Sequence, residues 1–303
     1  MSCYIGIDGG GTKTEFLMSD GQGRITARLV EEGTSYQQYG FEEVAVRLKL
    51  GIRKCLETSG ASMQEVECIY MGLPCVGESA SGDENLKKAI FKMLPEEKIR
   101  IGNDVEAGYA GALGQDCGIH LVAGTGSIGY GMNENGETAR CGGWHEYFSD
   151  EGSCCWLGRK TMELFTKEAD GRCEKGRLYE LLRQEFKLES DFDWVQKIME
   201  NYLYKREKIA SLQIFLMRAA KEGDMYARDL YRQAAAELYL IAEGIKKKLG
   251  MDSAVISYSG GLFKSGGLIL EPLRRMAKEG GDTLKAPKAG PGEGALLLAR
   301  SYA

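Results

Sequence analysis

IGIDGGGTKT, residues 5–14, joins a short apolar run to an aspartate, three glycines, a threonine and a lysine. The apolar residues before Asp8 predict a β-strand, and the glycines allow the tight turn that must follow it. Residues 14–18 predict a returning strand, and Asp20-Gly21 predicts a second turn before a third strand at 24–29. Asp-Gly between apolar runs is a strong hairpin signal. The chain should therefore begin with antiparallel β-hairpins.

The same arrangement occurs a second time, beginning at residue 119. A strand at 119–123 precedes the glycine-rich turn 124–127, a strand at 128–132 follows, and Asn135-Gly136 marks the second turn. Twelve positions separate Gly9 from Gly21, and twelve also separate Gly124 from Gly136. Such internal similarity predicts a duplicated architecture, with one hairpin-containing sheet in each copy.

Helical and strand patterns alternate between and after these hairpins, which predicts an α/β fold. We expect a first domain at 1–113, completed by the C-terminal helix 291–303, and a second domain at 114–290 with a helical insertion at about 153–249. The expected helices are 42–59, 84–94, 105–113, 225–248 and 293–302, and the further strands are 67–73, 98–101 and 254–258.

Composition excludes several classes of protein. Hydrophobic residues make up 43% and charged residues 27% of the 303 residues, which is typical of a globular chain with a sizeable core. The net charge of −5 gives no general attraction to nucleic acid or anionic lipid. The nine cysteines include no C-x-x-C pair, so they do not predict a metal cluster. With no apolar membrane span and no export signal at the N-terminus, we expect a cytoplasmic protein.

The glycine-rich turns are candidate nucleotide loops, but neither has a common nucleotide-binding pattern. The P-loop sequence G-x-x-x-x-G-K-[ST] is absent. Gly124, Gly126 and Gly129 match G-x-G-x-x-G, yet a turn follows them where a dinucleotide fold requires a helix. We therefore expect the two hairpin turns to face each other and hold a triphosphate. Asp8, Thr12 and Lys13 would supply an acid, a hydroxyl and a cation.

Six motifs together resemble one known family. They are IGIDGGGTKT at 5–14, IGNDVEAGYAGA at 101–112, LVAGTGSIGYG at 121–131, GGWHEYFSDEGS at 142–153, SYSGGLF at 257–263 and PGEGALLLA at 291–299. In this order they are similar to the BadF/BadG/BcrA/BcrD ATPase family, and within it to the N-acetylglucosamine kinase type. The resemblance implies a two-domain actin-like ATPase (ribonuclease H-like) fold, with ATP and Mg2+ in a cleft that closes on the substrate.

The resemblance also implies cofactor-binding residues. Asp8 would hold Mg2+, largely through water, as this small cation usually requires. The residues expected to contact phosphate are Gly10, Gly11, Thr12 and Lys13 in the first turn and Thr125, Gly126 and Ser127 in the second. Gly260 and Gly261 would contact the adenosine, with Gly223 as a further candidate.

The catalytic base is expected to be a carboxylate. The chain has two histidines, and His120 lies in an apolar strand where a structural role is expected. Asp104 follows a short strand and precedes a helix, a place where an aspartate commonly acts as N-cap. It also matches the family's catalytic aspartate, and it would be ionised at neutral pH. A capping role would not exclude catalysis.

The resemblance implies seven sugar-binding residues, and this chain departs from the family pattern at two of them, Ser35 and His145, and at the neighbouring Ser149. His145 and Ser149 stand where glycine is usual, and Ser35 stands where asparagine is common. N-acetylglucosamine is the first expected substrate, followed by glucosamine or another amino or neutral hexose. The seven expected substrate-binding residues are Ser35, Asn103, Asp104, Gly143, Trp144, His145 and Asp150.

Two other functions stay open at this point. One is an activase that uses ATP hydrolysis to drive an iron–sulfur protein, although the cysteine-glycine context expected for its cluster is not evident. The other is a sensor that binds nucleotide or sugar without turnover. The presence of Asp8, Asp104 and Asp150 argues against a sensor. Family likeness also suggests a homodimer.

Overall fold

The computed structural model describes residues 2–145 and 147–303, and the chain divides into two compact units. The first unit comprises Met1–Asp116 together with Pro287–Ala303, and the second comprises Cys117–Ala286. Within the described residues, no helix is long and apolar enough to span a membrane.

A mixed five-stranded sheet forms the centre of the first unit. Its strands are β1 (Cys3–Gly9), β2 (Lys13–Asp20), β3 (Ile25–Glu32), β4 (Val66–Leu73) and β5 (Ile99–Asn103). They lie in the order β3-β2-β1-β4-β5, with β1 antiparallel to β2 and parallel to β4. The predicted N-terminal hairpins are therefore confirmed.

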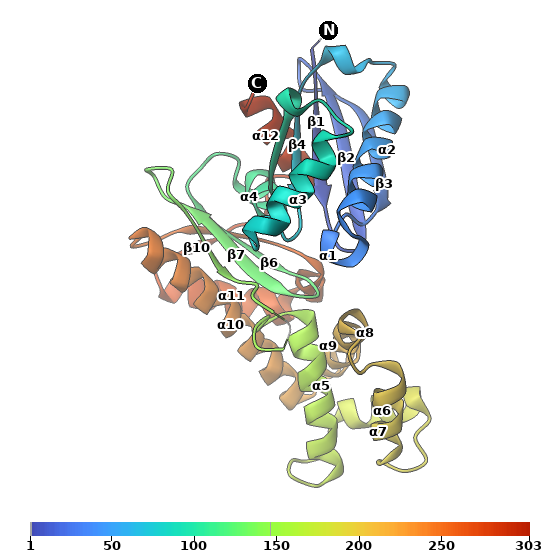
Figure 1. The fold of residues 1–303 in the computed structure, drawn as a ribbon. Coiled ribbons are helices and arrows are strands. Elements are labelled where there is room, and N and C mark those ends of the chain that lie inside the picture. Colours follow the sequence, from blue (N-terminus) through green and yellow to red (C-terminus); the bar gives the residue numbers. More distant parts are fainter. Residues whose placement is uncertain (1, 146) are drawn as a thin grey trace. The chain divides into compact units, whose positions relative to one another are not determined.

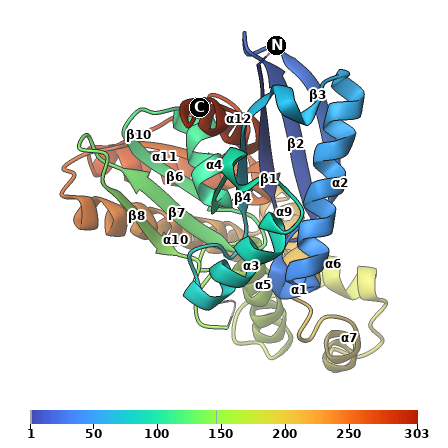
Figure 2. The ribbon, with the colours of Figure 1, turned by 45° about the horizontal axis from the view of Figure 1, so that its top comes forward.

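Helices cover both faces of this sheet (Figure 1, Figure 2). The helices α2 (Phe41–Ser59) and α3 (Ala80–Phe91) pack against the face that carries Ile5 and Ile7, and α1 (Tyr36–Tyr39) precedes them. The opposite face carries α4 (Asp104–Leu113) and α12 (Pro291–Ser301). Gly6 permits this close packing, because a Cβ there would lie 2.2 Å from the backbone nitrogen of Leu296.

The second unit repeats the strand order of the first. Its strands are β6 (Gly118–Ala123), β7 (Ser127–Met132), β8 (Thr138–Gly142), β9 (Val255–Ser259) and β10 (Thr283–Leu284). The order β10-β9-β6-β7-β8 matches the first sheet strand for strand, which confirms the duplicated hairpin-containing sheets. The strand β10 and the helix α11 (Gly267–Glu279) were not predicted. A two-residue strand carries too little sequence pattern to be recognised.

Six helices are inserted between β8 and β9, as expected for the second copy. They are α5 (Cys154–Ala169), α6 (Arg177–Phe186), α7 (Asp193–Asn201), α8 (Arg206–Ser211), α9 (Gln213–Lys221) and α10 (Met225–Leu249). The long helix α10 packs against β7 and β8 (Figure 1). Short 3₁₀ helices occur at Met63–Glu65, Glu96–Lys98 and Gly261–Ser265.

Candidate active site

The first glycine-rich turn connects β1 to β2 and is held by the segment that follows β3. The backbone N–H of Thr34 donates to the carbonyl of Gly10 (2.9 Å), and the Tyr39 hydroxyl donates to the carbonyl of Gly11 (3.2 Å). Gly33 has no room for a side chain, because a Cβ there would lie 2.1 Å from the Gly11 oxygen. These three supporting residues were not predicted from the sequence.

Asp8 lies near the end of β1, where it pairs with Glu15 of β2. The pKa of the Asp8 carboxyl is raised to about 8, mainly by burial and also by the neighbouring carboxylates of Asp104 and Glu15, whereas Lys13 opposes the shift. Three acidic side chains thus interact at this end of the sheet. Their mutual repulsion favours a bound cation.

Gly72 explains how Asp104 comes close to Asp8. In the sheet, Gly72 of β4 pairs with Asp8 on one side and with Gly102 of β5 on the other. A Cβ at Gly72 would lie 2.9 Å from the Cβ of Ala107 and 3.4 Å from the Cα of Asp104. The glycine therefore lets α4 begin directly against the end of the sheet.

Asn103, rather than Asp104, is the N-cap of α4. The Asn103 Oδ1 accepts from the N–H of Val105 (3.1 Å), and its Nδ2 donates to the carbonyl of Val76 (2.6 Å). The side chain of Glu106 completes the capping box by accepting from the Asn103 N–H (3.4 Å). The capping role considered for Asp104 is therefore wrong. Asp104 is the first residue of the helix, where the helix dipole stabilises its negative charge.

The loop after β4 brings Ser35 close to the start of α4. The Ser35 Oγ lies 3.9 Å from the Cys75 Sγ, and the Tyr36 hydroxyl donates to the Cys75 carbonyl (3.2 Å). The next residue, Val76, accepts from Asn103. Cys75 and Val76 were not predicted, although they follow the end of a strand, as Asp104 does. Their position just after a predicted strand was the signal by which the sequence could have identified them.

The second glycine-rich turn is fastened to the beginning of α5. The N–H groups of Cys154 and Cys155 donate to the carbonyls of Gly124 (2.9 Å) and Thr125 (3.1 Å). Ser127 uses its N–H to bind the Asp150 Oδ1 (3.1 Å) and its hydroxyl to bind the Glu151 carbonyl (2.7 Å). Both donors of Ser127 thus have protein partners. Thr125, Gly126 and Ser127 stay predicted phosphate contacts.

Asp150 lies between the second turn and a residue that was not predicted, Arg206. Its Oδ1 accepts from Ser127, and its Oδ2 accepts from the Nη2 of Arg206. Asp150 also has a left-handed backbone, with φ of 65°, which is uncommon outside glycine. The sequence contains no signal for the Asp150–Arg206 pair, because 56 positions separate the two residues.

The expected sugar-binding loop begins with two glycines in left-handed conformations. Gly142 and Gly143 have φ of 75° and 66°. The Gly143 carbonyl accepts from the Nη2 of Arg140 (3.2 Å), and the Trp144 N–H donates to the Ser149 Oγ (3.4 Å). The serine that departs from the family pattern thus closes this loop. Trp144 is 81% exposed.

The ring of His145 is exposed beside two further aromatic side chains. It stacks on the rings of Tyr147 and Phe148, with centroid distances of 5.3 Å in each case. The other histidine, His120, is fully buried, and its Nε2 lies 2.9 Å from the Ser259 Oγ. Burial lowers the pKa of His120 to about 4, so this residue is neutral at physiological pH, as its expected structural role requires.

Gly260 and Gly261 lie against the second turn, whereas Gly223 lies on a different element. A Cβ at Gly260 would be 2.2 Å from the Ala123 carbonyl oxygen, and a Cβ at Gly124 would be 3.9 Å from the Gly261 nitrogen. Gly223 forms the turn between α9 and α10, where its N–H donates to the Ala220 carbonyl (3.3 Å).

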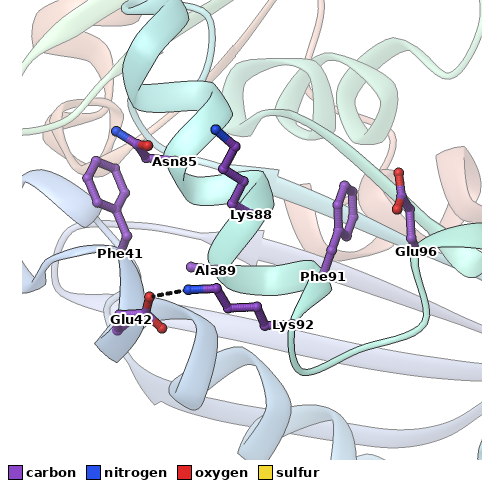
Figure 3. A pocket seen from close by; sticks show the side chains of 8 residues that line it. All are labelled: Phe41, Glu42, Asn85, Lys88, Ala89, Phe91, Lys92 and Glu96. Carbon is purple, nitrogen blue, oxygen red and sulfur yellow. Dashed lines mark hydrogen bonds and ion pairs between the residues drawn. The ribbon is translucent and has the colours of Figure 1, made fainter.

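A groove of about 610 Å³ lies elsewhere in the first unit, between the start of α2 and α3 (Figure 3). Phe41 and Phe91 contribute apolar surface, and Lys92 forms an ion pair with Glu42 across it (3.1 Å). None of the predicted site residues lines this groove. We therefore assign the candidate site to the strand ends and turns.

The two matching sheets define an actin-like ATPase fold. The crystal structure of a Chromobacterium violaceum protein, named as a candidate N-acetylglucosamine kinase, superposes with a TM-score of 0.80 at 23% identity and 99% coverage of both chains. Residues 5–299 match the model of the BadF/BadG/BcrA/BcrD ATPase family, and the chain belongs to this family.

Two named relatives are similar over almost their whole length. The N-acetylmuramic acid/N-acetylglucosamine kinase of Clostridium acetobutylicum is 30% identical to this chain, and the match covers 99% of each of the two chains. The N-acetyl-D-glucosamine kinase of Dictyostelium discoideum is 28% identical, with 98% of this chain and 97% of the relative covered.

Proposed function

We propose that this protein is a sugar kinase that transfers the γ-phosphoryl group of ATP to a hydroxyl of an N-acetylated amino sugar. N-acetylglucosamine is the first candidate acceptor, and N-acetylmuramic acid is the second. Family membership supports ATP as the donor, and the names of the two relatives support the acceptor class. Glucosamine and neutral hexoses are the alternatives to be tested.

The observation that carries this proposal is the approach of Asp104 to Asp8 beside Gly72. Gly72 pairs with Asp8 in the sheet, a Cβ at Gly72 would lie 3.4 Å from the Cα of Asp104, and the Asp104 carboxylate raises the pKa of Asp8. Phosphoryl transfer requires a site for a cation and a group that orients the attacking hydroxyl. In the first unit, Asp8 near the end of β1 is the candidate for the cation site, and Asp104 after β5 is the candidate for orienting the hydroxyl.

Asp104 is the proposed general base. In the transfer step, the acceptor oxygen forms a bond to the γ-phosphorus while the bond from that phosphorus to the β,γ-bridging oxygen breaks. The Asp104 carboxylate accepts the hydroxyl proton, and ADP leaves with the electron pair of the broken bond. The capping role of Asn103 leaves the Asp104 carboxylate unused for helix capping.

The residues present fit a magnesium ion held partly by water. Within residues 2–145 and 147–303, no three His, Cys, Asp or Glu side chains gather closely enough to form a complete metal site. Mg2+ commonly binds through one or two carboxylates, with water and substrate phosphate as the other ligands. Asp8 would be its protein ligand, and the ion would neutralise charge on the phosphates.

The proposed phosphate contacts come from both glycine-rich turns. Lys13 provides a cation and Thr12 a hydroxyl beside Gly10 and Gly11, and Thr125 and Gly126 belong to the second turn. Gly260 and Gly261 are the proposed adenosine contacts, because they lie directly against that second turn. Gly223 is a weaker candidate on a separate element.

The proposed sugar contacts are Ser35 and Asn103 in the first unit and Gly143, Trp144 and His145 in the second. An exposed tryptophan suits the apolar face of a pyranose ring, which aromatic side chains commonly bind. Asp150 is the sixth proposed sugar contact, and its carboxylate also binds Ser127 and Arg206.

The test is a coupled assay of ADP release with N-acetylglucosamine, N-acetylmuramic acid, glucosamine and glucose. We expect release that depends on an N-acetylated sugar, and mass spectrometry should identify the sugar phosphate. Hydrolysis that is independent of sugar would instead support an ATPase that acts on another protein. Nucleotide binding without release with any sugar would support a sensor.

A further inference from the structure

Arg206 occupies a position that the proposed chemistry does not yet use. We propose that its guanidinium binds a phosphate group of ATP at the turn Gly124–Ser127, and that Asp150 is the positioning residue for this guanidinium. The inference rests on the proposed function in one respect, namely that the second turn binds nucleotide phosphate. It adds a cation from the inserted helices to that turn.

The backbone of Arg206 is anchored by close packing between α8 and α5. A Cβ at Gly158 of α5 would lie 1.9 Å from the carbonyl oxygen of Ile209 in α8, so the two helices touch at this glycine. The same helix α5 binds the second turn through the N–H groups of Cys154 and Cys155. Helix α5 therefore fixes both the turn and the helix that carries Arg206.

The guanidinium lies directly over the turn. A Cβ at Gly126 would be 2.3 Å from the Arg206 Nη2 and 2.6 Å from the Asp150 Oδ1. An anion bound by the backbone of this turn would consequently lie within reach of Arg206. Glycine at position 126 leaves the space that the guanidinium and the carboxylate need.

Charge supports the same conclusion. Lys13 supplies a cation to the first turn, whereas Gly124–Ser127 contains no charged side chain. The side chain of Arg206 is 41% exposed, but that of its partner Asp150 is only 3% exposed. The pair thus presents its positive partner to solvent. A guanidinium has five N–H donors in a planar arrangement that matches phosphate oxygens.

Asp150 orients the guanidinium. Its Oδ1 is fixed by the Ser127 N–H (3.1 Å), and its Oδ2 binds the Arg206 Nη2, so one carboxylate connects the turn to the cation. A charge held by such bonds in advance loses less side-chain entropy when the ligand binds. This explains why a nearly buried acid lies next to a turn proposed to bind anions.

The experiment compares nucleotides that differ in phosphate number. Isothermal titration calorimetry without sugar would measure the dissociation constants of ATP, ADP and AMP for the wild type, Arg206→Gln and Arg206→Lys. We expect Arg206→Gln to weaken ATP binding by about tenfold, or about 1.4 kcal/mol, while AMP binding changes less than about twofold. The ATP dissociation constant of Arg206→Lys should lie between those of the wild type and Arg206→Gln, because lysine keeps the charge but loses the planar donor arrangement.

Lys208→Gln is the matched control, because Lys208 is an exposed cation on the same helix. It should leave the ratio of ATP to AMP affinity unchanged. Gly126→Ala should lower this ratio, since the added methyl group would displace both Arg206 and Asp150. Combining Asp150→Asn with Arg206→Gln should cost no more ATP affinity than Arg206→Gln alone.

A purely structural role for Arg206 would give a different result. Arg206→Gln would then lower the melting temperature and weaken ATP and AMP equally, or leave both unchanged, and either result overturns the inference. Failure of the proposed function is distinguishable, because it would appear as wild-type protein that binds ATP but releases no ADP with any sugar. A wild type that binds no nucleotide would overturn both.

Discussion

Asn103 takes the capping role that was considered for Asp104, and Asp104 stays the predicted catalytic residue. Asn103 caps α4 and binds the loop carbonyl of Val76, whereas Asp104 is the first residue of the helix. Adjacent residues can differ in this way because the cap has an extended backbone, with φ of −77° and ψ of 150°, whereas the next residue is helical.

Replacing Asp104 with asparagine should lower kcat by about 10² to 10⁴, because the acceptor hydroxyl loses its proton acceptor. The ATP dissociation constant should change little. Steady-state ADP release and calorimetric titration would measure the two effects. Asp252→Asn, which alters an exposed aspartate, serves as the control. Near-normal turnover by the Asp104 variant would exclude it as the base.

Gly260 and Gly261 form a natural pair of test positions. Gly260 has φ of 109° and no room for a Cβ beside the Ala123 backbone, whereas nothing lies within 4 Å of a Cβ at Gly261. We expect Gly260→Ala to destabilise the protein by about 1–3 kcal/mol or more, measured by urea unfolding. Gly261→Ala should keep its stability and change only nucleotide affinity. Equal losses of stability in Gly260→Ala and Gly261→Ala would contradict the different roles proposed for the two glycines.

At the scale of elements, the start of α6 depends on two buried carboxylates. Glu168 of α5 accepts from the Gly176 N–H (2.8 Å), and Asp224, the N-cap of α10, accepts from the Leu178 N–H (3.0 Å). The pKa of Glu168 is raised to about 7, mainly by burial; the Gly176 N–H opposes this shift, and the nearby Asp224 adds to it. Three helices thus meet at a titratable group.

This arrangement predicts that stability falls as pH rises. Between the ordinary pKa of 4.5 and about 7, the folded state binds the Glu168 proton more tightly than the unfolded state does. The unfolding free energy should therefore fall over this window, by on the order of 2–3 kcal/mol, and change no further above it. Glu168→Gln should remove this slope and be more stable than the wild type at pH 8.

Urea unfolding at several pH values between 4.5 and 8 would test this prediction. Glu163→Gln is the control, because Glu163 lies on the same helix with its side chain 49% exposed. An unchanged pH dependence in Glu168→Gln would show that other groups cause the slope.

For the whole molecule, the C-terminal segment completes the unit in which the chain began. The helix α12 packs against α4, and a Cβ at Gly294 would lie 2.0 Å from the Ala107 oxygen and 2.2 Å from the Gly111 nitrogen. Both neighbours are backbone atoms of a packed helix, so neither can move away easily. The first unit therefore forms only when residues almost 300 positions apart come together.

Gly294→Ala should consequently destabilise the protein by about 1–3 kcal/mol or more, because the two helices must separate. Hydrogen exchange should show the loss of protection in β1, β4 and α4. Leu297→Ala, at a position 37% exposed on the same helix, should have a much smaller effect. Unchanged protection in Gly294→Ala would mean that the helix contact tolerates a methyl group.

Much of the fold was predictable, because hairpins, turns and amphipathic helices depend on residues close in sequence. The equal spacing of the Gly9 and Gly124 turns revealed the duplication, and the matching strand orders confirm it. The motifs also identified the family that the comparisons show. The short strand β10 was missed because two residues form no periodic pattern.

The candidate site was predictable only as a set of residue types at strand ends and glycine-rich turns. The tertiary structure decided which side chains meet: Asn103 with Val76, Ser35 with Cys75, and Asp150 with Arg206. Each pair joins segments that are far apart along the chain and that approach only after helices and sheets have packed. Local sequence patterns contain no information on such approaches, because the packing of side chains and backbone across elements determines them.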